Sequence, residues 1–461
     1  MNQHKSIGVL GAGTWGLALA RLLHRNGHQV TVWSALEREI DALNATHRHP
    51  NLPGMIIPDE IRFTKDDQEV CRDKDILLFA VPSVFVRSTA ARVRAFIPDG
   101  QIIVDVAKGV EPLTLMTMTE VIRDELVKDG AHAGVKLVAL SGPTHAEEVA
   151  LDMPTSIVSA CTDMQVAETV QDVFMNTCMR TYTNTDVLGV ELCGALKNII
   201  ALASGISAGL GYGDNTRAAL ITRGMAEISR LGLAMGCAEQ TFNGLAGIGD
   251  LIVTATSQHS RNNRCGRLIG EGMTPAEAVK AVGMVVEGIN ALPAAMQLAR
   301  RYHVEMPIVA GVNAVVGGEI TAEDMALMLM TRDKTREVSQ KELTVRFESA
   351  LLRSLNHGPL HRVMVWGRFD TLNSAVLRQL REMKACGGHL TVALAGLDAT
   401  LNERRACLEA LRCVDAVIPA DGTAELLSAI RAQHASMLFA PRPEELSFLQ
   451  GAGVEVLPYP D

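Results

Sequence analysis

The chain has 461 residues, more than one hydrophobic core usually organises, so we expect two or three domains. Hydrophobic residues make up 48% of it and charged residues 21%, the balance of an ordinary globular protein. The formal net charge of −9 argues against binding along a nucleic-acid backbone, because such binding depends on clustered cations. A local anion-binding site remains compatible with this charge.

Short apolar, β-branched runs alternate with helical periodicity over the first part of the chain. The predicted strands are 6–11, 29–33, 75–81, 101–107, 135–142, 155–160 and 180–183. This alternation predicts crossover helices and a mainly parallel sheet, an α/β domain over residues 1–188. Long helical periodicity begins at about Thr185 and predicts an all-helical domain over 189–340.

The last part of the chain returns to the α/β pattern. Periodicity weakens over 341–360, which we interpret as a linker. Strands are predicted at 362–367, 389–396, 416–420, 436–441 and 454–459, with helical segments at 371–387 and 400–413. A third, smaller α/β domain is therefore expected over 361–461.

The nine cysteines are scattered without a C-x-x-C pair, which fits reduced thiols better than a disulfide framework. The N-terminus has no long apolar run before a small-residue cleavage site. No stretch reaches the 18 or more apolar residues that typically span a bilayer. We therefore expect a cytoplasmic protein without a membrane span, and no motif predicts a metal site.

A glycine-rich turn follows the first predicted strand. Gly11, Gly13 and Gly16 have the G-x-G-x-x-G spacing, directly ahead of an amphipathic helix that ends near Gly27. The first glycine permits a tight turn, the second lets the backbone approach a pyrophosphate, and the third lets helix pack on strand. A turn that binds nothing is the alternative, but the strand–turn–helix context favours a Rossmann dinucleotide site.

The end of the second predicted strand bears on the choice between NAD and NADP. An acid there would bind the ribose 2′-hydroxyl of NAD, but the strand ends at Ser34, with Glu37 and Arg38 further on. The missing acid and the nearby Arg38 favour NADP slightly without excluding NAD. Ser34 and Arg38 are the candidate contacts at this end of the cofactor.

One lysine stands among small and apolar residues on a predicted helix. Lys197 lies within CGALKNIIALASG, residues 193–205. A lysine that snorkels from the rim of a buried helix is the alternative reading. Burial beside a second cation would lower the pKa of this amine, so that it exchanges a proton near neutral pH.

Further polar residues follow predicted strands or precede predicted helices. They are Lys108, the turn Gly142-Pro143-Thr144, Asp250, the triplet Ser260-Arg261-Asn262, and Glu287. Each one alone is as compatible with capping or solvation as with catalysis.

Together these motifs resemble those of the bacterial NAD(P)-dependent glycerol-3-phosphate dehydrogenases. GAGTWGLALA, AKGVE, SGPTHAEEVA, GALKNIIALASGI, GLAGIGDLIVT, SRNNRCGRLIGEG and VVEGI occur in the family's order over about residues 5–335. The resemblance implies Lys197 as the proton acceptor, with Lys108 and Asp250 beside it. The implied substrate contacts are Lys108, Gly142, Thr144, Asp250, Ser260, Arg261 and Asn262. The implied cofactor contacts are Thr14, Trp15, Lys108, Ala146, Arg261, Val285 and Glu287.

The resemblance further implies reversible hydride transfer between NAD(P)H and dihydroxyacetone phosphate, giving sn-glycerol 3-phosphate. This product would supply phospholipid or glycerol-phosphate polymer and capsule precursors, and a homodimer is expected. A catalytically silent NAD(P)-binding sensor and an oxidoreductase acting on another hydroxyl compound remain alternatives.

Residues 362–460 are similar to glycerol-3-phosphate cytidylyltransferases of the nucleotidyltransferase superfamily, through GRFDTL, ERR and CVDAVIP. The superfamily's H-x-G-H signature is replaced by Asn373, Ser374, Ala375 and Val376. None of these supplies a protonated imidazole for a triphosphate, so we expect no cytidylyl transfer and interpret the segment as a structural, dimerising or regulatory module. A bifunctional enzyme that also forms CDP-glycerol is the alternative.

Overall fold

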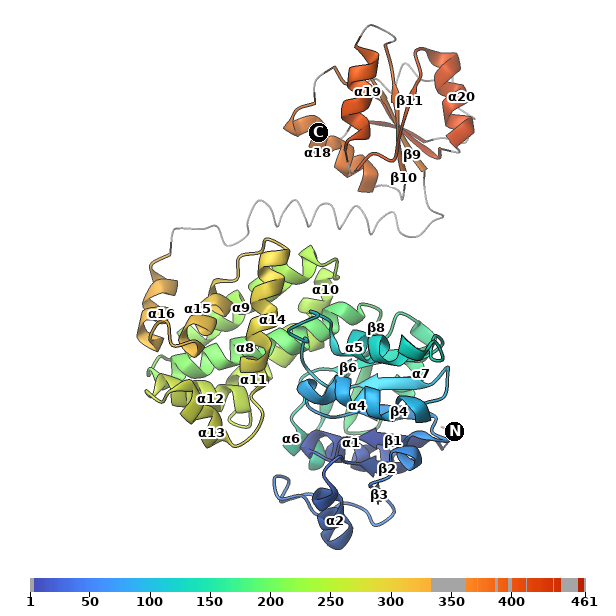
Figure 1. The fold of residues 1–461 in the computed structure, drawn as a ribbon. Coiled ribbons are helices and arrows are strands. Elements are labelled where there is room, and N and C mark those ends of the chain that lie inside the picture. The colour runs from blue at the N-terminus through green and yellow to red at the C-terminus, as the bar shows by residue number, and fades with distance from the viewer. Residues whose placement is uncertain are drawn as a thin grey trace. The chain divides into compact units, whose positions relative to one another are not determined.

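In the computed structural model of the chain, the described residues are 4–332, 362–370, 372–385, 389–396, 400–411, 413–433, 435–440 and 455–459. The linker predicted over 341–360 lies outside them. Contacts divide the chain into two compact units, Met1–Asp333 and Lys334–Asp461, and each is described by itself (Figure 1).

The first unit begins with an eight-stranded sheet of order β3-β2-β1-β4-β5-β6-β7-β8. Its strands are β1 (Ser6–Leu10), β2 (Gln29–Trp33), β3 (Arg62–Thr64), β4 (Ile76–Phe79), β5 (Ile102–Asp105), β6 (Lys136–Ser141), β7 (Thr155–Ala160) and β8 (Met179–Asn184). The β6–β7 pair is antiparallel and the other pairs are parallel, which confirms the mainly parallel sheet. β3 was not predicted from the sequence, because its three residues are too few to show a strand pattern.

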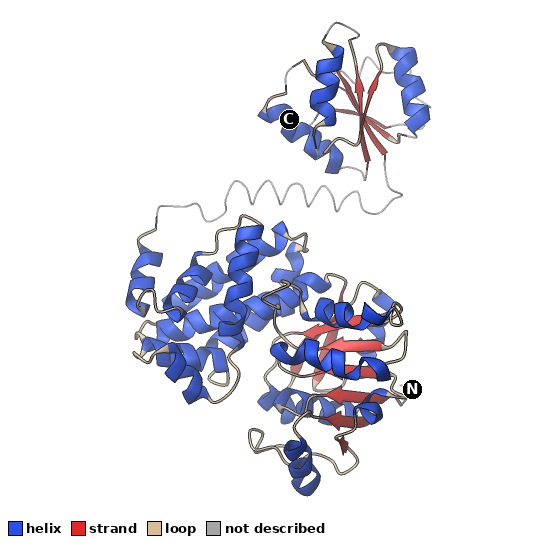
Figure 2. Ribbon diagram, viewed as in Figure 1, coloured by secondary structure: helices blue, strands red, loops and turns tan. Residues whose placement is uncertain are grey.

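Helices cover both faces of this sheet (Figure 2). One face packs against α1 (Thr14–Arg25), α2 (Glu37–Thr46), α6 (Ala146–Ala150) and α7 (Met164–Phe174). The other packs against α3 (Asp67–Cys71), α4 (Val86–Val93) and α5 (Met118–Leu126). The strand order reverses between β1 and β4, and open α/β sheets bind ligands at the carboxyl ends of their strands at such a point.

The rest of the first unit is helical, as expected from about Thr185 onward. Its elements are α8 (Val187–Gly209), α9 (Asp214–Ala234), α10 (Glu239–Phe242), the π-helical turn η4 (Leu245–Gly249), α11 (Asp250–Thr256), α12 (Arg261–Gly270), α13 (Pro275–Val282), α14 (Glu287–Arg301), α15 (Pro307–Val316) and α16 (Ala322–Met330). Together with the sheet, these helices place the first unit in the α/β-plus-helical class predicted for it.

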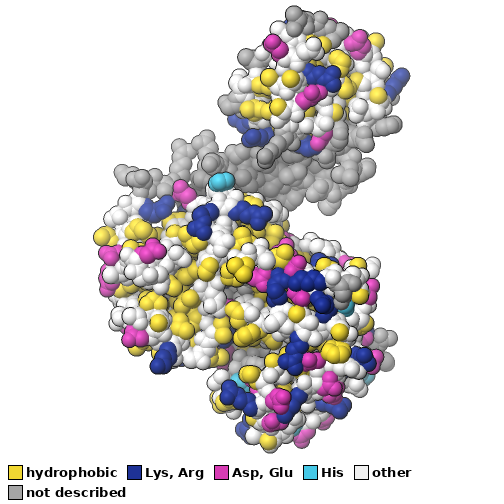
Figure 3. Space-filling model, viewed as in Figure 1, with side chains coloured by type: hydrophobic (Ala, Val, Ile, Leu, Met, Phe, Trp, Pro, Cys, Tyr) yellow, Lys and Arg dark blue, Asp and Glu magenta, His cyan; other side chains and the backbone are white. Residues whose placement is uncertain are grey.

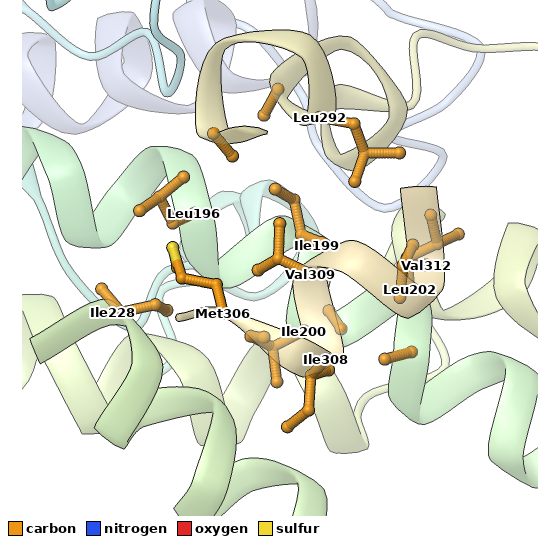
Figure 4. Close-up of a cluster of buried hydrophobic side chains, with 14 of the residues drawn as sticks. Leu196, Ile199, Ile200, Leu202, Ile228, Leu292, Met306, Ile308, Val309 and Val312 are labelled. Atoms are coloured by element: carbon orange, nitrogen blue, oxygen red, sulfur yellow. The ribbon is translucent and has the colours of Figure 1, made fainter. Parts of the chain in front are cut away.

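Helix α8 lies at the centre of the helical region. Its residues are buried on every side from Gly189 to Ser207. Figure 4 shows Leu196, Ile199 and Ile200 of α8 among apolar side chains of α9, α14 and α15. By length and composition α8 could cross a membrane, but 89% of its apolar window is buried inside the protein, as expected of a core helix.

Glycines bring α8 and α12 into backbone contact. A Cβ atom on Gly266 would lie 2.1 Å from the Leu202 carbonyl oxygen, and one on Gly270 would lie 2.2 Å from that of Ile206. A Cβ atom on Gly205 of α8 would meet the α12 backbone at a similarly short distance. No larger side chain fits at these crossings, so the glycines set the spacing of the two helices.

The second unit contains a five-stranded sheet of order β11-β10-β9-β12-β13, with all pairs parallel. Its strands are β9 (Arg362–Gly367), β10 (His389–Leu394), β11 (Ala416–Pro419), β12 (Met437–Ala440) and β13 (Glu455–Pro458), and its helices are α18 (Ser374–Ala385), α19 (Leu401–Glu409) and α20 (Thr423–Gln433). Apolar clusters lie on both faces of the sheet. The described residues therefore form the α/β arrangement expected here.

The glycine contact between α8 and α12 generates a stability prediction. Gly266→Ala should lower the free energy of unfolding by about 2–3 kcal/mol, because the added methyl group overpacks a backbone contact. Gly249→Ala is the control. Gly249 has helical backbone angles, and a Cβ atom there would lie 3.6 Å from the Gly244 carbonyl oxygen, an ordinary contact distance. Denaturant unfolding followed by circular dichroism measures both; equal effects would contradict the overpacking argument.

Candidate functional site

A cleft of about 780 Å³ opens at the carboxyl edge of the first sheet and reaches the helical region. Most residues of the predicted motifs line it together: Gly11, Gly13, Thr14, Trp15, Ser34, Lys108, Thr144, Ala146, Lys197, Ser260, Arg261, Asn262, Val285 and Glu287. Gly16, Gly142 and Asp250 lie outside the lining, Asp250 with no exposed surface. Arg38 is exposed and also lies outside the lining, so the structure does not bring it into the cleft.

The glycine-rich turn has the geometry that a pyrophosphate needs. Gly11 has a φ of +124°, and a Cβ atom there would lie 2.6 Å from the Ala80 carbonyl oxygen. A Cβ atom on Gly16 would lie 2.2 Å from the Gly11 carbonyl oxygen. Around Gly13, by contrast, no atom lies within 4 Å of the Cβ position. The backbone is thus tightly packed at Gly11 and Gly16 and open at Gly13. This open space lies at the N-terminal, positive end of α1, where a diphosphate fits.

Three charged side chains meet at the inner end of the cleft. Lys197 of α8 donates to Oδ1 of Asp250 at 2.5 Å, and Lys108, which follows β5, donates to Oδ2 at 2.7 Å. Lys197 also donates to the Thr254 hydroxyl, whose own proton goes to the Asp250 carbonyl oxygen. Lys108 also donates to the Gly142 carbonyl oxygen at 3.2 Å. Each carboxylate oxygen of Asp250 therefore holds one lysine.

Burial lowers the pKa of Lys197 to about 7. The side chain is 4% exposed, so the ammonium form loses most of its hydration. The Asp250 carboxylate opposes this shift and the Lys108 ammonium reinforces it. The result is an amine on the cleft wall that gains or loses a proton near neutral pH.

The fold around α11 explains how the buried Asp250 carboxylate reaches its two lysine partners. The chain makes the π-helical turn η4 just before it, and Gly247 has a non-helical backbone there. A Cβ atom on Gly247 would lie 2.1 Å from the Phe242 carbonyl oxygen, so the turn needs glycine. Asp250 then starts α11 with its carboxylate facing the two lysines.

The start of α12 forms another part of the cleft wall. Ser260 caps the helix by accepting from the Asn263 backbone N–H at 3.2 Å. Asn262 donates to the Asn198 side chain of α8 at 3.0 Å and accepts from the Gly288 backbone N–H at 2.8 Å. Arg261 lies between these two anchored residues and also lines the cleft. The helix start is therefore held rigidly next to Lys197.

A further contact joins the two halves of the cleft. Glu287, the first residue of α14, accepts from the Ser83 hydroxyl at 2.7 Å and from the Ser83 backbone N–H at 3.3 Å. Ser83 lies in η1 (Ser83–Phe85), just after β4. The helical region and the sheet are thereby connected by two residues that line the cleft.

Several cleft residues were not predicted from the sequence. They include Ser83, His145, Asn198 and Thr254. His145 follows the predicted Gly142-Pro143-Thr144 turn directly, a neighbour that the motif itself could have indicated. Burial lowers the pKa of His145 and the nearby Lys197 charge lowers it further, which favours its neutral form. Thr254 follows Asp250 by one helical turn, a spacing that could have marked it as a partner.

The chain is similar to known proteins over the ranges that contain the cleft residues. Residues 6–167 match the family model of the NAD-dependent glycerol-3-phosphate dehydrogenase N-terminus, and residues 186–327 match that of its C-terminus. Glycerol-3-phosphate dehydrogenase (NAD(P)+) 2 of Lactobacillus delbrueckii subsp. bulgaricus is 69% identical over 334 residues, which are 72% of this chain and 99% of that protein. The enzyme of the same activity name from Agathobacter rectalis is 51% identical over 337 residues, which are 73% of this chain and 98% of that protein.

Among solved structures, the glycerol-3-phosphate dehydrogenase of Coxiella burnetii is similar, with a TM-score of 0.68 and 34% identity. The match covers 71% of this chain and 99% of that one. Both family-model matches fall within the first unit.

Proposed function

We propose that this chain, which belongs to the glycerol-3-phosphate dehydrogenase family, interconverts dihydroxyacetone phosphate and sn-glycerol 3-phosphate with NAD(H) or NADP(H). The observation that carries the proposal is the buried Lys197–Asp250–Lys108 group, which lies in the same cleft as the open glycine turn. Residues 1–188 would bind the cofactor, and the helical residues from 189 onward would complete the substrate site.

The nicotinamide cofactor, when bound, supplies or takes up the hydride. The residues that would hold it are the glycine turn, Thr14, Trp15, Ala146, Val285 and Glu287, all of which line the cleft except Gly16 beneath the turn. The open space over Gly13 supports placing the pyrophosphate there.

Lys197 is the proposed proton donor and acceptor. An ammonium group has three N–H bonds, and two of these go to Asp250 and Thr254, so one remains for the cleft that Lys197 lines. During reduction this proton goes to the substrate oxygen on which negative charge develops. During oxidation the neutral amine accepts the hydroxyl proton. Lys108 stabilises the developing oxyanion, and Asp250 orients both lysines.

Arg261 and the start of α12 are proposed to hold the substrate phosphate. A guanidinium group binds phosphate in a bidentate manner, and the N-terminus of a helix favours an anion. Asn262 and Ser260, whose hydrogen bonds anchor this helix start, would position it rather than react. Thr144, which follows β6 and lines the cleft, would add a further contact, and Gly142 outside the lining would act by holding Lys108.

For the second unit we propose a nucleotidyltransferase-like module that no longer transfers a cytidylyl group. Its parallel sheet, with the first strand at the centre, supports such a doubly wound fold. The Asn373 side chain accepts from the Val376 backbone N–H at 3.0 Å, so it caps α18 where the family signature would place imidazoles.

Localisation and assembly are proposed on separate observations. The described cysteines are free thiols, which supports a cytoplasmic protein. A homodimer is supported by apolar side chains that gather on the helical region in the face drawn in Figure 3. Leu327 and Met330 of α16 are 64% and 83% exposed, a surface that a second copy would cover.

The role of Lys197 predicts a loss of activity and a pH dependence. Lys197→Ala should lower kcat for dihydroxyacetone phosphate reduction by about 10²–10⁴-fold while NADPH or NADH still binds. Because the pKa of Lys197 is about 7, the wild-type reduction rate should fall as pH rises through 7, and the oxidation rate should rise. Cofactor absorbance follows both directions. Lys280→Ala, at an exposed lysine outside the cleft, is the control; a near-normal rate in Lys197→Ala would refute the mechanism.

The role of Arg261 predicts a binding defect. Arg261→Gln should raise the KM for dihydroxyacetone phosphate about tenfold or more, because a charge-assisted phosphate contact is lost. Arg267→Gln, at an exposed position of the same helix outside the cleft, should leave KM unchanged. Steady-state kinetics distinguish the two, and an unchanged KM in Arg261→Gln would place the phosphate elsewhere.

The proposal for the second unit predicts that the protein releases no pyrophosphate from CTP and glycerol 3-phosphate, since no imidazole is available at Asn373 or Val376. A coupled pyrophosphate assay on the full chain tests this, with an active cytidylyltransferase as positive control. Release above background would favour the bifunctional alternative.

A further inference from the structure

We propose that the end of the cleft beside β2 selects NAD(H) over NADP(H), with Glu39 as the residue that accepts from the ribose 2′-hydroxyl and excludes a 2′-phosphate. This inference rests on the proposed function and assigns the cofactor preference that the function leaves open. It also reverses the slight preference for NADP drawn from Ser34 and Arg38 in the sequence.

The direction of the cofactor in the cleft follows from two fixed points. The first is Lys197, the proposed reacting group, which lines the cleft and is 4% exposed. The glycine turn lies directly beside β2, because the Gly11 backbone N–H donates to the Trp33 carbonyl oxygen at 2.8 Å. A dinucleotide whose pyrophosphate lies over Gly13 therefore places its adenosine against the residues that follow Trp33.

Two exposed apolar side chains mark where the adenine ring would lie. Leu36, between β2 and α2, and Phe85, at the end of η1, are each 53% exposed, and both line the cleft. Side chains of this size on a cleft wall are typical of a site that takes a flat, apolar ring. The purine would cover them and leave its ribose next to Ser34.

Glu39 occupies the position of the acid that is missing from the end of β2. It lies in the first turn of α2 and lines the cleft. The Ser34 hydroxyl donates to Oε2 of Glu39 at 2.5 Å and accepts from the Leu36 backbone N–H at 3.1 Å, so this carboxylate is held in place. Among the described residues Oε1 has no hydrogen-bond partner. It is therefore available to accept from the ribose 2′-hydroxyl.

Two arginines are the candidate cations for a 2′-phosphate at this end of the cleft. Arg38 is exposed and outside the lining. Arg92 of α4 lines the cleft, but its Nε donates to Asp67 at 2.7 Å and its guanidinium lies 5.0 Å from the centre of the Trp33 ring. A 2′-phosphate would thus face the Glu39 carboxylate, and like charges repel. The Nε of Arg92 is already engaged by Asp67, which leaves only its Nη atoms for such a phosphate.

The test measures binding and kinetics with both cofactors. Fluorescence titration should give a Kd for NADH about tenfold or more below that for NADPH, and kcat/KM should follow the same order. Glu39→Gln, which removes the charge at constant size, should reduce this ratio about tenfold. Glu37→Gln is the matched control, because Glu37 lies on the same helix with a side chain that is 78% exposed and outside the lining.

Arg92→Ala provides a second, independent variant. If Arg92 is paired with Asp67 as described, its loss leaves the NADH to NADPH ratio unchanged; a selective loss of NADPH binding would overturn the proposal. A wild-type preference for NADPH, or a ratio that Glu39→Gln does not move, would overturn it as well. Preferential NADH binding without reduction of dihydroxyacetone phosphate would instead refute the proposed function and leave this inference standing.

Discussion

The candidate site depends on one carboxylate that has lost all contact with water. Burying the Asp250 charge alone would cost several kcal/mol, and two lysine ammonium groups offset that cost. The three groups then carry one surplus positive charge in a poorly hydrated place. Release of the Lys197 proton removes the surplus, which fits the pKa of about 7 that burial gives this amine.

This cluster exists because distant segments are held at fixed spacing. Lys108 follows β5, Lys197 lies in the middle of α8, and Asp250 starts α11. Gly247 permits the turn that aims Asp250 inward, and the glycines between α8 and α12 set how close Arg261 comes to α8. The chemistry of the site therefore relies on backbone contacts as much as on the charged residues themselves.

The sequence predicted the features that depend on local patterns. Strand runs, the switch to helices near Thr185 and the glycine spacing all show in short windows, because periodicity and turn chemistry are local. The strand β3 was too short to show. Contacts between residues far apart in the sequence, such as that between Glu287 and Ser83, cannot be recognised in a short sequence window.

The cofactor end of the cleft shows the same limit more sharply. Arg38 and Glu39 are neighbours in the sequence, but the orientation of α2 places the second in the cleft and the first in solvent. Spacing along a helix identifies which residues share a face, whereas the direction of that face depends on how the helix packs. The sequence therefore pointed to the helix that borders the cleft, but not to the side chain on it that lines the cleft.

Helix α8 carries Lys197 with packed neighbours on every side. Evolution can therefore alter this helix only by exchanges that conserve volume, since any larger change would shift the amine relative to Asp250. We therefore expect divergence in substrate range or cofactor choice at cleft residues outside α8, such as Glu39 of α2.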